Sequence, residues 1–195
     1  MNKIPIDIVL LPSEEIIEKA IELNQKINSK KIVLGKENSI PHISLCMAVI
    51  DETDLEKVTN ILNSILEKYS ILNLNISKLK VDSLNDNENW VNLKVEKSNK
   101  LQSLHEDIIN NLRPFLTNNF SKEIFTIPNE INDTTIMWAS NYLENSSFNN
   151  FSSHISLGIG ETEEKNLDIN FTSKKIAICK LGNYCSCEKI LKIIN

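Results

Sequence analysis

The sequence has 195 residues, of which 41% are hydrophobic and 24% are charged, and its formal net charge is −5 at pH 7. This length and balance are typical of one soluble globular domain, or of two small lobes that share an interface. The acidic balance argues against tight binding to a duplex or a long nucleic-acid strand, which depends on neutralising many phosphates. A short or terminal nucleotide needs only local hydrogen-bond donors and is not excluded.

No run of about twenty apolar residues suits a membrane span, and the amino terminus lacks the apolar core and cleavage site of a signal peptide. We therefore expect a cytoplasmic, monomeric protein that does not bind membranes. The four cysteines, Cys46, Cys179, Cys185 and Cys187, are interpreted as reduced thiols. The Cys185-x-Cys187 spacing is too short for a zinc knuckle, so we expect no metal and no other cofactor.

The first half of the chain alternates strand and helix patterns. An apolar strand ends at Pro12, and Ser13 is placed to cap a helix whose apolar residues recur at helical spacing. A later helix stops before Pro114. The expected elements are a strand at 6–11, a helix after Ser13, a strand at about 41–50, a helix opened by Asp51 or Thr53, strands at about 71–82 and 89–96, and a helix at about 98–112.

The second half is less regular. Residues 113–151 contain two prolines and many Asn and Ser residues, so we expect loops there around one strand at 135–139, with room for a short helix. Later strands are expected at about 153–160 and 174–181, before an apolar stretch at 190–194. The recurring order of elements favours an internal duplication into two lobes, approximately 1–85 and 86–195, of a single domain.

Two of the three histidines belong to the same short pattern of His, apolar residue, hydroxyl and apolar residue. The two copies are His42-Ile43-Ser44-Leu45 and His154-Ile155-Ser156-Leu157. Because side chains alternate along a strand, each His shares a face with the Ser two residues later. A single strand histidine is more often structural than catalytic, but a matched pair favours catalysis. One imidazole can accept a proton while the other donates one, and the hydroxyls can hydrogen-bond a phosphate.

At these two motifs the chain resembles the 2H phosphoesterase superfamily, which includes 2′-5′ RNA ligase-like proteins and cyclic nucleotide phosphodiesterases. The family motif is two copies of His-apolar-Thr/Ser, and Pro41 before the first His also fits. The strand and helix from Trp90 to His105 resemble the opening of the family's second lobe. Ser153 stands where the family commonly has Pro, and the interval between the motifs is longer than usual, with the excess placed in 113–151.

The resemblance implies a bilobal α+β fold, in which two antiparallel sheets form a central groove and helices cover the outer faces. It also implies a phosphodiesterase that needs no metal and acts on a small or terminal nucleotide. His42 and His154 would then be the catalytic acid and base, in an order that the sequence leaves open. Ser44 and Ser156 would bind the phosphate. The substrate would be a 2′,3′-cyclic phosphate, or a cyclic or 2′-5′-linked oligonucleotide.

Three aromatic residues, Trp138, Phe151 and Tyr184, are candidates for stacking on a base, although packing in the core or at the rim is the favoured interpretation of each. His105 lies in a helical pattern without a hydroxyl two residues later, and we interpret it as structural. Two other functions stay open. One is a nucleotide-binding module without turnover, and the other is an RNA ligase or end-processing factor.

Overall fold

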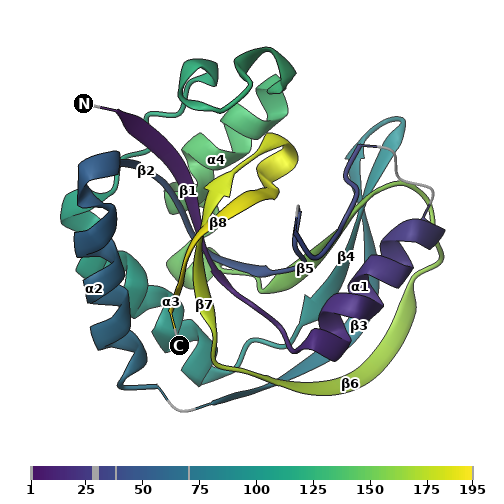
Figure 1. Cartoon of the computed structure of the whole chain (residues 1–195). Helices are drawn as coiled ribbons and strands as arrows, with labels where there is room; N and C mark the ends of the chain where they lie inside the picture. Colours follow the sequence, from purple (N-terminus) through teal and green to yellow (C-terminus); the bar gives the residue numbers. More distant parts are fainter. Residues whose placement is uncertain (1, 28–30, 38, 70, 195) are drawn as a thin grey trace.

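Eight strands form two antiparallel sheets in the computed structural model, which describes residues 2–27, 31–37, 39–69 and 71–194 (Figure 1). Sheet one has the strand order β2-β1-β7-β8, and sheet two has the order β5-β4-β3-β6. The strands are β1 (Lys3–Leu10), β2 (Ile43–Asp51), β3 (Leu72–Asn85), β4 (Glu88–Val95), β5 (His154–Ile159), β6 (Lys165–Ser173), β7 (Ile176–Leu181) and β8 (Cys187–Ile194). The α+β class with two antiparallel sheets agrees with the expectation.

The sheets do not follow the order of the chain. β7 and β8 return to pair beside β1, whereas β3 joins sheet two. The approximate lobes 1–85 and 86–195 therefore do not coincide with the two sheets, since each sheet draws strands from both. Strand β6 was not expected, although Leu167, Ile169 and Phe171 alternate with polar residues in it as a half-buried strand should.

Four α-helices accompany the sheets in the described residues, and the three expected from helical spacing are confirmed. Ser98 caps α3, because its hydroxyl accepts a hydrogen bond from the backbone N–H of Leu101. Ser13 occupies the N-cap position of α1, but its side chain makes no capping hydrogen bond. The helices are α1 (Glu14–Lys26), α2 (Leu55–Leu66), α3 (Asn99–Leu112) and α4 (Asp133–Asn145).

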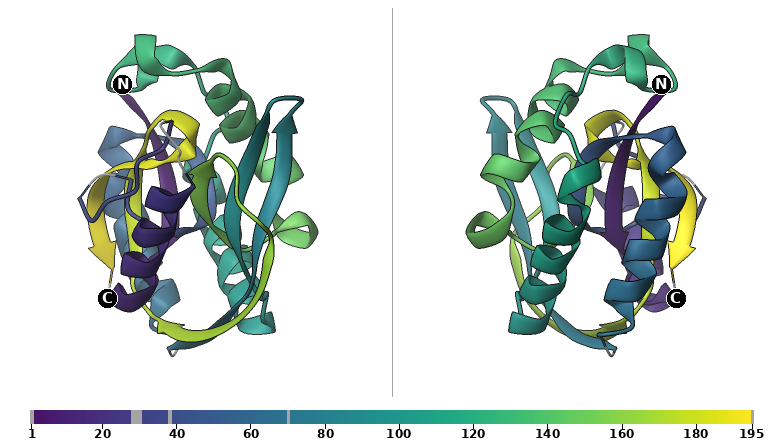
Figure 2. Two further views of the ribbon diagram at one scale, coloured as in Figure 1. Left: turned by 90° about the vertical axis from the view of Figure 1, so that its right-hand side faces the viewer. Right: turned by 90° about the vertical axis from the view of Figure 1, so that its left-hand side faces the viewer.

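The segment between α3 and β5 differs from the expectation. Residues 135–139 belong to α4 and not to a strand. Asn132 caps this helix by accepting from the backbone N–H of Thr135, and Asp133 stands in its first turn, where a negative charge is favourable. Within the described chain, the strand-like pairing of this segment is the single bridge between Thr117 and Val49. Figure 2 shows the segment arching over one end of the molecule.

The cysteines also differ from the expectation. Cys179 on β7 and Cys187 on β8 form a disulfide, with their Cα atoms 5.4 Å apart, whereas Cys46 and Cys185 are free. The interpretation of all four as reduced thiols is therefore wrong for one pair, which the β7–β8 hairpin brings together. A cytoplasmic location stays a prediction, and the disulfide weighs against it. No helix in the described part of the chain is long and apolar enough to cross a membrane.

Candidate active site

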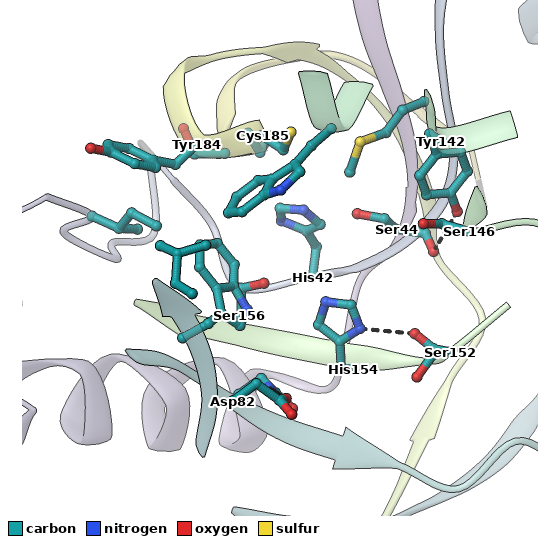
Figure 3. Close-up of a pocket in the computed structure, with 18 of the residues that line it drawn as sticks. His42, Ser44, Asp82, Tyr142, Ser146, Ser152, His154, Ser156, Tyr184 and Cys185 are labelled. Carbon is teal, nitrogen blue, oxygen red and sulfur yellow. Dashed lines mark hydrogen bonds between the residues drawn. The ribbon is translucent and has the colours of Figure 1, made fainter. Parts of the chain in front are cut away.

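The two motif strands lie at neighbouring edges of the two sheets, so that both histidines open into one cleft. β2 is the edge strand of sheet one and β5 is the edge strand of sheet two, and the two strands contact each other. The cleft has a volume of about 850 Å³, and His42, Ser44, His154 and Ser156 all line it. Figure 3 shows the imidazoles of His42 and His154 near each other in this space.

Each of the two imidazoles makes the same contact with its own backbone. Nδ1 of His42 lies 2.6 Å from the carbonyl oxygen of Ile40, and Nδ1 of His154 lies 2.8 Å from that of Ser152 (Figure 3). A carbonyl oxygen can only accept a hydrogen bond, so in both rings Nδ1 carries a proton. Nε2 is therefore the atom that can exchange a proton with a ligand.

Each motif strand has one unpaired residue directly after its serine. The pairing of β1 with β2 skips Leu45, and the pairing of β4 with β5 skips Leu157. Such an extra residue is a β-bulge, which bends the strand and changes which later side chains share a face. The two halves of the site are thus built alike, down to the position of the bulge.

The bulge overturns the expected faces of β2 beyond the serine. Strict alternation from His42 would place Cys46 in the cleft and Met47 against the helices. In the structure Cys46 is fully buried in the core and Met47 lines the cleft. On β5, Gly158 occupies the position that Cys46 has on β2, two residues after the motif serine. Its φ is 140°, in a region of backbone conformation that favours glycine.

A polar side chain from a helix satisfies the backbone at each bulge. His105 of α3 donates from Nδ1 to the carbonyl of Leu45 at 2.8 Å, and its Nε2 accepts from the backbone N–H of Phe148 at 2.9 Å. Asn24 of α1 donates to the carbonyl of Leu157 at 2.6 Å. His105 is fully buried, and burial lowers its pKa. Its interpretation as a structural histidine agrees with these contacts.

Asp7 of β1 is the site residue that sequence reasoning missed. Its carboxylate is fully buried, and Oδ2 accepts a hydrogen bond from Oγ of Ser44 at 2.6 Å. The same oxygen lies 3.5 Å from Nε2 of His42. A signal was present, because Asp7 is the only acidic residue in an otherwise apolar strand interior, and charged residues are rarely buried without a partner. The hydroxyl proton of Ser44 is thus directed to Asp7 in this structure.

The two imidazoles have opposite electrostatic environments. Burial opposes charge on His42, but its contacts with Asp7 and the Ile40 carbonyl outweigh burial and raise its pKa. Burial lowers the pKa of His154, the Ser152 carbonyl offsets only part of this effect, and the nearby His42 charge lowers the pKa further. When one of the two imidazoles carries an extra proton, that proton therefore favours His42 over His154.

All three aromatic candidates line the cleft, although their surroundings differ. The ring of Trp138 on α4 packs edge-to-face on Trp90, with ring centroids 5.0 Å apart. Tyr184 lies in the turn before β8 and has φ at 54°. Phe151 is only 4% exposed, and its ring stacks on His105 at a centroid distance of 4.0 Å. The contacts of Phe151 are thus largely those of a core residue.

Polar residues on the sheet-two side of the cleft were also missed. Lys94 pairs across the strands with His154, and Asn92 pairs with Ser156. Asn92 donates to Oδ2 of Asp82 at 3.1 Å, and the same carboxylate binds Lys80. All four of these side chains line the cleft. The alternating polar residues of β3 and β4 carried this signal, since they share a face with the second motif once the strands are paired.

No family model and no curated protein matches the chain by sequence. Solved structures match it over nearly its full length. TT0787 of Thermus thermophilus aligns with a TM-score of 0.63 and 11% identity, covering 97% of this chain and 96% of that one. LigT of E. coli, solved in complex with 3′-AMP, aligns with a TM-score of 0.56 and 11% identity, covering 98% and 97%.

The chain has the LigT fold. The resemblance to the 2H phosphoesterases, first seen in the two His-Ile-Ser motifs, therefore extends to the fold. At 11% identity the likeness to LigT and TT0787 concerns the arrangement of sheets and helices. The activity of this protein therefore depends on the residues of its own cleft.

Proposed function

We propose that this protein is a phosphodiesterase that needs no metal and opens the 2′,3′-cyclic phosphate of a small or terminal nucleotide. The observation that carries the proposal is the pair of imidazoles in one cleft, each with its Nδ1 bound to the carbonyl two residues earlier. This arrangement leaves two Nε2 atoms for one substrate. Two histidines in opposite protonation states are sufficient for general acid–base catalysis at phosphorus.

In the proposed reaction, His154 is the base and His42 is the acid. Nε2 of His154 takes a proton from water as the water oxygen bonds to phosphorus. The bond from phosphorus to one ribose oxygen breaks, and Nε2 of His42 gives its proton to that oxygen. Ser156 donates a hydrogen bond to a non-bridging phosphate oxygen, which gains charge in the transition state. Exchange with solvent returns both histidines to their starting states.

The size and polarity of the cleft support a small nucleotide as substrate. Its volume of about 850 Å³ lies within the range of small-ligand sites, roughly 300–1,000 Å³. LigT, which shares the fold, was solved with 3′-AMP, a nucleotide that has its phosphate on the 3′ oxygen of the ribose. The net charge of −5 makes a long nucleic acid a poor ligand, because such ligands depend on many Lys and Arg contacts.

A substrate panel in the presence of EDTA tests the proposal. The panel consists of four nucleoside 2′,3′-cyclic phosphates, 3′,5′-cyclic nucleotides, and dinucleotides with 2′-5′ or 3′-5′ linkages, with products separated by chromatography. We expect a nucleoside monophosphate from the 2′,3′-cyclic substrates, and its identity as the 2′ or 3′ isomer reports which P–O bond breaks. Tight binding without turnover would favour a nucleotide-binding module. Joining of RNA ends in a separate assay, without hydrolysis of the panel, would favour a ligase.

A further inference from the structure

Burial of the Asp7 carboxylate destabilises the fold. A carboxylate without solvent contact loses its hydration, and proteins normally bury one only with partners. Oδ2 of Asp7 has two partners, Ser44 and His42, whereas Oδ1 is buried with no hydrogen-bond partner among the described residues. An apolar residue would suit this strand interior better, so stability does not explain the carboxylate.

We infer that Asp7 is the positioning residue that makes the two histidines unequal, holding a proton on His42 and leaving His154 as the proton acceptor. This inference rests on the proposed function, since it assigns the acid and the base of that reaction. Asp7 does not contact substrate in this scheme. It acts through His42.

The architecture of the two halves supports the assignment. Asp7 pairs with Met47, three residues after Ser44. In the other half, the residue three after Ser156 is Ile159, and it pairs with Trp90. The duplicated site therefore has a carboxylate beside the first histidine and an indole in the corresponding place of the second half. Only one of two otherwise similar imidazoles receives a buried negative charge.

The distance between Oδ2 of Asp7 and Nε2 of His42 allows the carboxylate to stabilise a proton on the imidazole without accepting it. At 3.5 Å the Nε2 and Oδ2 atoms are close enough for strong attraction, yet beyond the usual 2.7–3.2 Å of an N–H···O hydrogen bond. The Nε2 proton therefore stays available to a leaving oxygen in the cleft. Burial raises the pKa of Asp7, against the lowering effect of His42, Ser44 and His154. Asp7 and His42 are in contact and shift each other's pKa, so their titrations belong to the pair and not to either residue alone.

Other titratable groups face Asp7 from neighbouring elements. His154 approaches from β5, and Tyr142, Cys46 and Cys185 approach from α4, β2 and the turn before β8. Burial raises the pKa values of Tyr142 and of both thiols, so these three stay neutral around pH 7. The proton balance near neutrality thus belongs to Asp7 and the two histidines.

The test is an NMR titration of the imidazole rings in the ligand-free protein. The chain has only three histidines, so His→Gln variants assign every ring signal. In the wild-type protein, His42 should titrate at a higher pH than His154. In Asp7→Asn, which keeps the shape and removes the charge, the His42 midpoint should fall by about one pH unit or more, the usual effect of an adjacent opposite charge.

Asp82→Asn is the matched control. Asp82 lies on the sheet-two side and its charge acts on His154, so the control should leave the His42 midpoint in place. The inference would be overturned by an unchanged His42 midpoint in folded Asp7→Asn. Should that variant fail to fold, the wild-type order alone decides, because a His154 midpoint at or above that of His42 also overturns it.

Turnover gives an independent measurement. If the protein hydrolyses a cyclic phosphate, activity requires a proton on the Asp7–His42 pair and therefore falls at high pH. In Asp7→Asn this alkaline limb should move to lower pH, while the acidic limb set by His154 stays nearly fixed. A shifted titration without any hydrolysis would contradict the proposed function and leave the role of Asp7 intact. Hydrolysis with an unmoved alkaline limb would contradict the role of Asp7 alone.

Discussion

Asn24 and His105 make equivalent contacts in the two halves of the site, where each donates a hydrogen bond to the carbonyl of the unpaired leucine in a motif strand. Asn24 belongs to α1 and supports β5, whereas His105 belongs to α3 and supports β2. Each bulge exposes a carbonyl that no neighbouring strand can satisfy, and an unsatisfied buried carbonyl is costly. The two side chains therefore stabilise the bulge that follows the serine of each motif.

Removal of either support should destabilise the protein. His105→Leu leaves the Leu45 carbonyl and the Phe148 N–H without partners, at a cost of about 2–6 kcal/mol in the free energy of unfolding, given about 1–3 kcal/mol for each unsatisfied group. Asn24→Leu should cost at least as much, because the Asn24 side chain also donates to the Ile32 carbonyl and accepts from the Leu34 N–H. Urea unfolding measures both. Wild-type stability in either variant would show that the carbonyls find other partners.

Stability should also fall in mild acid because of His105. Burial lowers the pKa of His105 in the folded protein, so the unfolded chain takes up a proton at a higher pH than the folded one does. Stability then rises with pH up to the unfolded pKa near 6.5 and is lost as pH falls below it. Unfolding midpoints of the wild type and His105→Gln at pH 5, 6, 7 and 8 test this expectation. The wild type should lose more stability between pH 7 and pH 5, and equal losses would speak against a buried neutral imidazole.

Ser156→Ala should reduce turnover more than binding. The hydroxyl is assigned to a phosphate oxygen whose charge grows in the transition state, so its loss should lower kcat by about a hundredfold, with a small change in KM. The pH limits of activity should not move, because Ser156 does not titrate. Ser64→Ala, an exposed serine on α2, is the control. An unchanged kcat in Ser156→Ala would remove the residue from the site.

Trp138→Ala tests whether Trp138, which packs on Trp90 at the cleft, stacks on the base of the substrate. Stacking of a base on an aromatic ring contributes about 1–3 kcal/mol, so KM for a cyclic nucleotide should rise by roughly tenfold or more, with kcat largely kept. An abasic ribose 2′,3′-cyclic phosphate is the matched substrate control and should be indifferent to the change. Equal losses on both substrates would indicate that Trp138 supports the structure through Trp90.

The strand alternation and helical spacing of the sequence predicted most of the fold, but not the elements whose signals conflict. Residues 135–139 contain β-branched and aromatic side chains that favour a strand, and the capping residue Asn132 that decides for α4 lies outside the apolar run. Cys46 and Met47 exchange the faces expected of them because of a bulge at Leu45. No residue of β2 itself predicts this bulge. Gly158 did offer such a signal in β5, since glycine within a strand often marks a bulge.

The candidate site was predictable where the sequence repeats itself and not where it relies on pairing between distant strands. Both His-Ile-Ser motifs could be read directly, whereas Asp7 comes to lie beside His42, and Asn92 beside Ser156, only through strand pairing with β2 and β5. The sequence could also not rank the two histidines. Their difference depends on a carboxylate 35 positions before His42 in the chain, which folding brings to 3.5 Å from its ring.

Hydrolysis of a nucleoside 2′,3′-cyclic phosphate by the wild type, His42→Gln and His154→Gln in the presence of EDTA decides whether the two histidines catalyse the proposed reaction. NMR spectra of the two variants first establish that both are folded. Two-histidine catalysis predicts metal-free turnover by the wild type and a loss of at least about a hundredfold in each variant, the usual scale for removal of a general acid or base. Wild-type rates in either folded variant would contradict it.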